Sequence, residues 1–377
     1  MRKFSRIHLI PFFLLATALI FLLANLPFYF LLDRNAQIFP FMDLSNSKAE
    51  KYWKEAYART GKKFPWTYGA EYPPNESLIE NPGRNIHFSE QLLKPNETFR
   101  ERQIGRITGR VITDTTYSAD ALGRRKTPGP KKTPRATVLM LGDSLTFGHA
   151  VQDHETASAF LAERFPDLRV LNFGIGGAGL NDILDLFLGP RGTEVLSDIK
   201  GPAIVILNLI DHDWLRGVCA TRHFSVDRNW MLKKNKYEVQ SSGQLVRVGT
   251  IGDRCPFYNV ANELLSWPVF RFYKVQLDEF QWGNGKKNSL AMLSALIQQL
   301  KKSIQVEKAV VSLVPWYSSR IGMDFEKDLA TVGFETWDFS DVVFDHLIKN
   351  PRIPVDHHFT PESQFIYSLM LGEKLEK

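Results

Sequence analysis

From residue 136 onward, the chain alternates apolar runs of strand length with stretches whose apolar residues recur at helical spacing. The apolar runs predict strands over 136–141, 169–173, 203–209, 308–314 and 334–338. The periodic stretches predict helices over 155–165, 180–188 and 288–304. Because strands that alternate with helices form a parallel sheet covered on both faces, we expect an α/β domain with a mainly parallel sheet over residues 136–377.

A long insertion, at about residues 218–285, separates the third predicted strand from the fourth. Inside it, 237–240 and 245–248 flank the letters Ser-Ser-Gly-Gln and predict a β-hairpin. The aromatic-rich stretch 270–282 has the spacing of a helix. Its apolar side chains can either pack against the core or line an acyl pocket.

Residues 33–135 form a less regular accessory region between the N-terminus and the α/β domain. The part up to about residue 100 mixes aromatic, charged and proline residues without a sustained period, and we interpret it as a juxtamembrane segment of short helices and loops. Short strands are predicted between 104 and 117. The basic stretch 124–135 is interrupted by prolines and is interpreted as a solvated linker rather than a phosphate-binding site.

Residues 7–32 contain no charged side chain and are rich in Leu, Phe, Ile and Ala. At about 1.5 Å per residue, a helix of this length crosses a hydrocarbon core of roughly 30 Å, so we predict an uncleaved transmembrane anchor. The basic residues within 1–6 then place the N-terminus in the cytoplasm and the remainder of the chain outside it. A cleaved secretory signal is the alternative, although the apolar run is longer than such signals usually have.

The composition narrows the class of partner. Lys and Arg outnumber Asp and Glu by 47 to 41, but they are dispersed rather than gathered into one stripe with aromatic residues, which argues against nucleic acid. We interpret the net charge of +6 as favouring solubility and attraction to a membrane surface. Cys219 and Cys255 lack the spacing of a zinc site, so we expect no metal. In an oxidising compartment these two cysteines can form a disulfide.

Polar residues that follow the predicted strands carry the candidate chemistry, because open parallel sheets bind ligands at the carboxyl ends of their strands. The first predicted strand is followed by Gly142-Asp143-Ser144-Leu145. A serine at this turn is exposed at the sheet edge, where its hydroxyl can act as a nucleophile and its N–H can donate to an oxyanion. Serine is also a favoured helix N-cap, and these letters fit both roles equally.

Glycines follow the second predicted strand, in the segment 172–179. They let backbone N–H groups approach a ligand or a reaction intermediate closely. The same letters match the G-x-G-x-x-G fingerprint of dinucleotide-binding folds. The acidic residue at the next strand end, Asp211, comes much later than the ~20 residues that this fingerprint requires, so we expect no nucleotide cofactor.

Near the C-terminus, Asp356 and His358 precede a predicted terminal helix. A serine nucleophile needs a histidine to take its proton and a carboxylate to orient that histidine. In an extended segment, residues two apart point to the same side, so Asp356 and His358 can face one site. Isolated histidines are more often surface or core residues than catalysts, and we interpret six others in that way: His8, His87, His149, His154, His223 and His346.

Together these features resemble the SGNH/GDSL hydrolases over roughly residues 136–377, and the letters Gly-Asp-Ser-Leu are the most specific part of the resemblance. It implies a flavodoxin-like three-layer α/β/α sandwich, with Ser144 as nucleophile, His358 as general base and Asp356 as the acid that orients it. It also implies an oxyanion hole built from the backbone N–H groups of Ser144 and Gly177.

The chain departs from the family pattern at two places. The third block of the family commonly reads Gly-x-Asn-Asp, with an asparagine that donates to the oxyanion, whereas His212 stands at that position here. An N–H of His212 can replace that donor. The family also commonly places its Asp three residues before the His, where this chain has Val355. We therefore assign Asp356 as the orienting acid and keep Asp338 as the alternative.

We expect a serine esterase or acylhydrolase that forms an acyl-enzyme on Ser144. With a sugar hydroxyl as the second nucleophile, the same residues give an O-acyltransferase. The predicted anchor makes ester-bearing lipids and cell-envelope glycans the expected substrates. A non-catalytic envelope protein that binds acylated ligands is the contrasting hypothesis, and the oligomeric state is left open.

Overall fold

The computed structural model describes residues 78–80, 92–105, 107–217, 233–254, 285–315, 324–340, 342, 352, 353, 356 and 358–377. The predicted anchor over 7–32, the two cysteines and the aromatic stretch 270–282 lie outside these residues. Within the described part of the chain, no helix combines the length and the apolar character that a membrane crossing requires.

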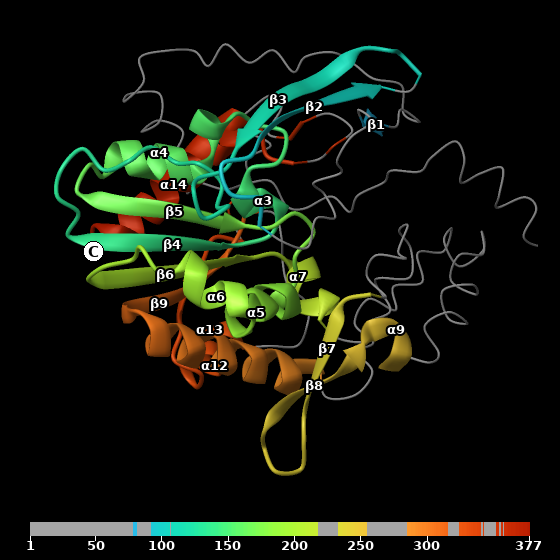
Figure 1. The fold of residues 1–377 in the computed structure, drawn as a ribbon, viewed down its shortest axis with the longest axis vertical. Helices are drawn as coiled ribbons and strands as arrows, with labels where there is room; N and C mark the ends of the chain where they lie inside the picture. The colour runs from blue at the N-terminus through green and yellow to red at the C-terminus, as the bar shows by residue number, and fades with distance from the viewer. Residues whose placement is uncertain are drawn as a thin grey trace, which may run out of the picture.

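A five-stranded sheet forms the centre of the α/β domain (Figure 1). Its strands are β4 (Ala136–Gly142), β5 (Leu168–Gly174), β6 (Pro202–Leu209), β9 (Gln305–Leu313) and β10 (Glu335–Asp338). All four pairings are parallel, and the order across the sheet is β10-β9-β6-β4-β5. From the β5 edge, the strands therefore stand in the chain order second, first, third, fourth, fifth, which is the flavodoxin-like order. The predicted parallel sheet is confirmed.

Helices cover both faces of this sheet. One face packs on α4 (Ala157–Arg164) and α14 (Pro361–Leu375), and the other packs on α5 (Leu180–Leu188) and α12 (Gly285–Ser303). Successive residues of β4 point to opposite faces, as a strand requires: Val138 joins the α4 side and Leu139 the α5 side. Because β4 is buried on both faces, it is apolar apart from Thr137. The three predicted helices are all present.

Short helices join the ends of the strands to these layers. They are α3 (Ser144–Phe147), the 3₁₀ helix η3 (Asp153–Glu155), α6 (Pro190–Val195), α7 (Asp211–Arg216), α9 (Ile251–Arg254) and α13 (Phe325–Ala330). The predicted hairpin of the insertion is β7 (Asn235–Val239) paired with β8 (Leu245–Thr250). Figure 1 shows the carboxyl ends of β4, β5 and β6 directed towards α3 and α7.

A second, antiparallel sheet precedes the domain in the chain. It consists of β1 (Leu78–Glu80), β2 (Thr98–Gly105) and β3 (Val111–Ser118). Tyr117 of β3 packs with Phe147, and Ile112 packs with Ala150 and Val151. Through these contacts the N-terminal sheet packs on the end of α3 and on the loop that follows it, a few residues after Ser144.

The interpretation of the basic stretch 124–135 as a solvated linker is wrong at its start. The side chains of Arg124 and Arg125 are 3% and 1% exposed. Arg124 pairs with Asp120 and Asp198, whereas Arg125 pairs with Asp153 and donates to three backbone carbonyls. These acceptors lie up to 74 residues away in the chain, so the local letters did not reveal them.

Candidate active site

Ser144 stands where β4 ends and α3 begins. Gly142 before it has φ 154°, and a Cβ there would come within 2.1 Å of the Thr146 side chain and 2.7 Å of the Asn208 carbonyl oxygen. Only glycine fits this turn. Asp143 is the N-cap of α3, because its carboxylate accepts a hydrogen bond from the N–H of Leu145 at 2.9 Å. The hydroxyl of Ser144 is therefore not the cap, and this decides between the two roles that its letters left open.

The structure brings Ser144, His358 and Asp356 together. The Nε2 atom of His358 lies 2.8 Å from the Oγ atom of Ser144, and its Nδ1 atom lies 3.0 Å from the Oδ2 atom of Asp356. All three side chains are nearly buried, with residue exposures of 5%, 7% and 9% for the serine, histidine and aspartate. This is the hydrogen-bonded series that a serine nucleophile requires.

Local structure fixes the segment that carries the histidine. Helix α14 begins at Pro361, and its N-cap Thr360 accepts a hydrogen bond from the N–H of Ser363. A proline at the first turn of a helix needs no hydrogen-bond partner for its nitrogen. The alternative acid, Asp338, is exposed and accepts hydrogen bonds from Ser340 instead. Within the described residues, it is therefore Asp356 that orients His358.

The acid of this arrangement is ionised. Burial disfavours its charge, but the rings of His358 and His149 outweigh burial and hold the pKa of Asp356 well below its usual range. An ionised carboxylate at Nδ1 leaves the proton of the imidazole on that nitrogen. The Nε2 atom is then free to accept the proton of Ser144.

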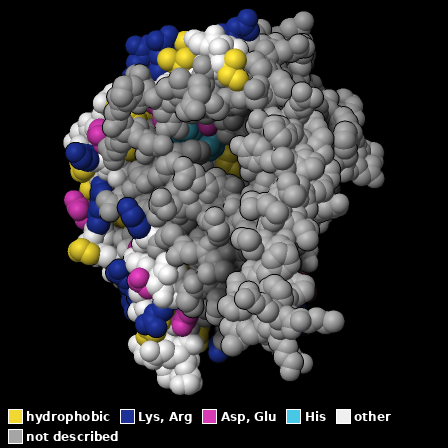
Figure 2. Space-filling view, turned by 90° about the vertical axis from the view of Figure 1, so that its right-hand side faces the viewer, with side chains coloured by type: hydrophobic (Ala, Val, Ile, Leu, Met, Phe, Trp, Pro, Cys, Tyr) yellow, Lys and Arg dark blue, Asp and Glu magenta, His cyan; other side chains and the backbone are white. Residues whose placement is uncertain are grey.

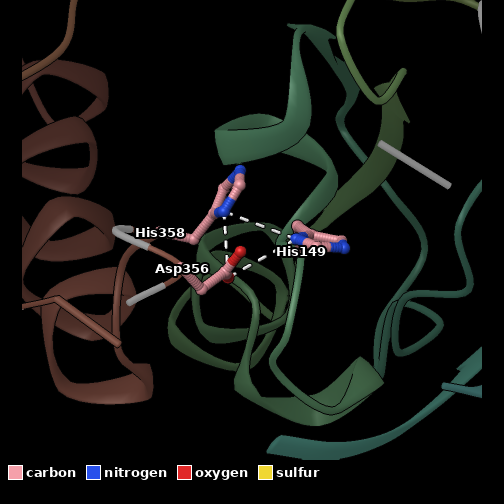
Figure 3. A group of neighbouring side chains, drawn as sticks. All are labelled: His149, Asp356 and His358. Atoms are coloured by element: carbon pink, nitrogen blue, oxygen red, sulfur yellow. Dashed lines mark hydrogen bonds and ion pairs between the residues drawn. The ribbon is translucent and has the colours of Figure 1, made fainter. Parts of the chain in front are cut away.

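His149, which we interpreted as an ordinary surface or core histidine, lies against these residues (Figure 3). Its Nδ1 atom lies 3.5 Å from the Oδ2 atom of Asp356 and 3.4 Å from the Nδ1 atom of His358. Its Nε2 atom forms an ion pair with Glu101 of β2 at 3.1 Å. The one feature of the sequence that could have indicated this place is that His149 follows Ser144 by five residues, just after α3.

The glycine turn lies beside the nucleophile. The carbonyl of Gly142 accepts from the N–H of Ile175 at 3.0 Å, and Asn172 donates to the carbonyl of Thr146 at 2.8 Å. Gly177 has φ 70°, a left-handed conformation that favours glycine. In the part of the chain that the structure describes, the N–H groups of Ser144 and Gly177 donate to no acceptor.

Helix α7, which follows β6, contacts the glycine turn. Arg216 of α7 donates to the carbonyl of Ala178 at 2.6 Å and to the carboxylate of Asp213 at 2.7 Å. Burial and the nearby carboxylate of Asp143 raise the pKa of Asp213 well above its usual value. His212 lies on the same short helix, but its side chain is outside the described residues. Its place in the oxyanion hole stays a prediction.

The spacing of three side chains at this site raises the question of a bound metal ion. One donor atom from each of His149, Asp356 and His358 lies within 4.8 Å of the others, a spacing that can hold a metal ion. The contact between His358 and Asp356 belongs to the series that takes the proton of Ser144, so it is explained without a metal. Histidine side chains are visible in one face of the molecule in Figure 2.

Neither a protein-family model nor a curated protein sequence matches the chain. Among solved structures, it is similar to a lipolytic protein of the G-D-S-L family from Veillonella parvula, at 10% identity and a TM-score of 0.33 over 63% of this chain and 97% of that one. An acetyl xylan esterase from Butyrivibrio proteoclasticus gives 10% identity and a TM-score of 0.33 over 67% of this chain and 66% of that one. A salicylyl-acyltransferase from a tetracycline biosynthetic pathway gives 12% and 0.30 over 81% of this chain and 76% of that one.

These neighbours are a GDSL-family lipolytic protein, an esterase and an acyltransferase. The first is described by the same family name as the one that the sequence motifs resemble. The class is defined by the chain itself: a flavodoxin-like sheet with a serine, a histidine and an aspartate in hydrogen-bond series at the carboxyl ends of its strands.

Proposed function

We propose that this protein is a serine esterase or acylhydrolase of the SGNH/GDSL type that acts through an acyl-enzyme on Ser144. The observation that carries the proposal is the hydrogen-bonded series from Ser144 through His358 to Asp356. A buried serine hydroxyl is a weak nucleophile until a neighbouring base can take its proton. Here that base lies 2.8 Å away and is oriented by an ionised carboxylate.

The reaction begins when the Oγ atom of Ser144 attacks the ester carbonyl carbon and its proton moves to the Nε2 atom of His358. The carbonyl oxygen becomes an oxyanion, which the N–H groups of Ser144 and Gly177 stabilise, with His212 as a third donor in this proposal. Collapse of the tetrahedral intermediate breaks the ester bond, and the leaving alcohol takes the proton from His358. The acyl group is now an ester of Ser144.

The second half repeats these steps with a new nucleophile. His358 takes a proton from the incoming hydroxyl, that oxygen attacks the acyl carbon, and the proton returns to the Oγ atom of Ser144 as the acyl group leaves. With water the product is a carboxylic acid, and with a sugar hydroxyl it is a transferred ester. Both outcomes need only the residues already described.

The substrate class follows from the predicted location. We propose that residues 7–32 anchor the chain with its N-terminus in the cytoplasm and the catalytic domain outside. An enzyme held at a membrane surface meets esters of lipids and of cell-envelope glycans first. The excess of basic residues supports this, because it favours approach to anionic surfaces.

A fluorophosphonate probe tests the proposal, because it reacts covalently with serines that a neighbouring base has activated. The purified wild type is expected to label, Ser144→Ala is expected not to, and Ser242→Ala is the matched control because Ser242 is an exposed serine of the β7–β8 turn. A folded wild type that does not label contradicts the enzyme proposal and favours a binding role. Labelling that persists in Ser144→Ala contradicts the choice of nucleophile.

A further inference from the structure

We propose that His149 is a positioning residue of the active site, which carries a positive charge and holds the Asp356 carboxylate in place against His358. Its own partner, Glu101, comes from the N-terminal sheet, so that sheet is part of the catalytic machinery. This inference rests on the proposed function, because a triad that does no chemistry needs no such support. It assigns a role to a second buried histidine that the mechanism above does not use.

The proton positions follow from the distances. In the catalytic arrangement, the Nδ1 atom of His358 carries a proton and donates it to Asp356, at 3.0 Å. That nitrogen then cannot accept a hydrogen bond from His149, although the two Nδ1 atoms are only 3.4 Å apart. The Nδ1 proton of His149 is therefore directed at the same oxygen of Asp356, at 3.5 Å. One carboxylate oxygen thus holds two imidazoles.

The second nitrogen of His149 settles its charge. Nε2 faces the Glu101 carboxylate at 3.1 Å, so each ring nitrogen of His149 faces a carboxylate oxygen and both are best satisfied as donors. Burial alone disfavours a charged ring, but Asp356 and Glu101 outweigh it and raise the pKa of His149 to about 10. His149 is 1% exposed, so water does not compete for either contact.

The N-terminal sheet builds the other side of this contact. Tyr117 of β3 donates its hydroxyl proton to Glu101 at 2.6 Å and accepts from the N–H of Ala150 at 2.9 Å. The first contact holds Glu101, which pairs with His149, and the second holds Ala150, which follows His149 in the chain. Burial, with the charge of Glu101, raises the pKa of the Tyr117 hydroxyl well above its usual value, so it stays a donor.

Arg125 holds the loop that carries His149 in place. Its guanidinium donates to the carbonyls of Phe147, Gly148 and Val151, and its Nε atom pairs with Asp153. It also lies over the rings of Tyr117 and Phe147. Among the described residues, the charged and titratable groups that face His149 are Glu101 and Tyr117 from the sheet and Asp356 and His358 from the C-terminal segment, with Arg125 over the ring of Tyr117.

The charge of His149 has a consequence that a purely structural histidine lacks. Its ring centroid lies 4.6 Å from that of His358, so its positive charge opposes a second positive charge there. A neutral side chain in place of His149 removes this opposition, so the fall in activity on the acidic side of the pH profile moves to higher pH. From two unit charges at this separation, partly relaxed by the protein, we expect a shift on the order of one pH unit.

The test compares His149→Gln and Glu101→Gln with the wild type in the full-length protein, using hydrolysis of p-nitrophenyl acetate across a pH series. His154→Gln is the matched control, because the His154 side chain is 74% exposed. For His149→Gln we expect kcat to fall by roughly tenfold to a hundredfold with little change in KM, and the acidic limb to move up by about one pH unit. Glu101→Gln is expected to change both in the same direction and by less, because Asp356 still faces His149.

The outcomes separate the two proposals. A folded His149→Gln with the kcat and the acidic limb of the wild type overturns the positioning role. A His149→Gln that loses thermal stability but keeps the pH dependence of the wild type also overturns the positioning role, because a purely structural histidine predicts that result. If His149→Gln does not fold, Glu101→Gln decides in its place. If the wild type neither hydrolyses the ester nor labels with the fluorophosphonate, the proposed function fails, and with it this role.

Discussion

Replacing Asp356 by Asn tests the electrostatic core of the site. The change keeps the shape of the side chain and removes its negative charge, which lies 3.0 Å from His358 and 3.5 Å from His149. At an effective dielectric constant of about 20, two unit charges 3.0 Å apart attract by roughly 5 kcal/mol. The imidazolium of His358 forms only as Ser144 attacks, so this attraction stabilises the transition state and not the resting enzyme.

An energy of this size corresponds to about four powers of ten in rate. We therefore expect Asp356→Asn to lower kcat for p-nitrophenyl acetate by roughly 10³-fold to 10⁴-fold, with KM changed by no more than a few fold. Asp338→Asn is the matched control, since Asp338 is exposed and bonds only to Ser340 among the described residues. A folded Asp356→Asn that keeps more than a tenth of the wild-type kcat refutes the reasoning, as does an equal loss in the control.

Three further results are expected. Gly177→Ala places a side chain at φ 70° and displaces an oxyanion donor, so kcat should fall by about tenfold or more, measured with the same ester. Arg125→Met removes the donor to three backbone carbonyls and the ion pair with Asp153, so the free energy of unfolding in urea should fall by about 3 kcal/mol or more, whereas exposed Arg100→Met should change it by less than about 1 kcal/mol. The pKa of His149 rises from 6.5 to about 10 on folding, so its contribution to stability is complete below pH 6.5 and is lost as the pH rises towards 10. Urea unfolding across this range should show that loss in the wild type and a smaller one in His149→Gln.

The sheet could be predicted because the residues that define each strand are neighbours in the sequence. Strands β4, β5, β6 and the second half of β9 are mainly apolar and buried, and each predicted run, including 334–338 at β10, overlaps an observed strand. Helix α5 has the predicted bounds, because Gly179 and Gly189 flank a strongly amphipathic stretch. The triad followed from a similar rule, since the carboxyl ends of parallel strands meet at one edge of the sheet.

The contacts that could not be predicted join distant parts of the chain. Glu101 and His149 have ordinary neighbours in the sequence, and only the packing of the N-terminal sheet on the loop after α3 makes them a pair. Arg125 lies in a basic stretch interrupted by prolines, a pattern typical of a solvated linker, and most of its acceptors are carbonyls that any residue provides. The sequence could not decide which residue caps α3 for a different reason. Asp143 and Ser144 are both good N-caps, and only the hydrogen bond from the N–H of Leu145 to Asp143 distinguishes them.

Trapping the acyl-enzyme tests the central claim most directly. The wild type, Ser144→Ala and Ser242→Ala are mixed with p-nitrophenyl acetate, quenched in acid within milliseconds to seconds, and examined as intact proteins and as peptides by mass spectrometry. The proposed mechanism predicts one acetyl group per chain on the peptide that contains Ser144, in the wild type and in Ser242→Ala, and none on that peptide in Ser144→Ala. Ester hydrolysis by the wild type without an acetylated Ser144, or with the acetyl group on another residue, would contradict it.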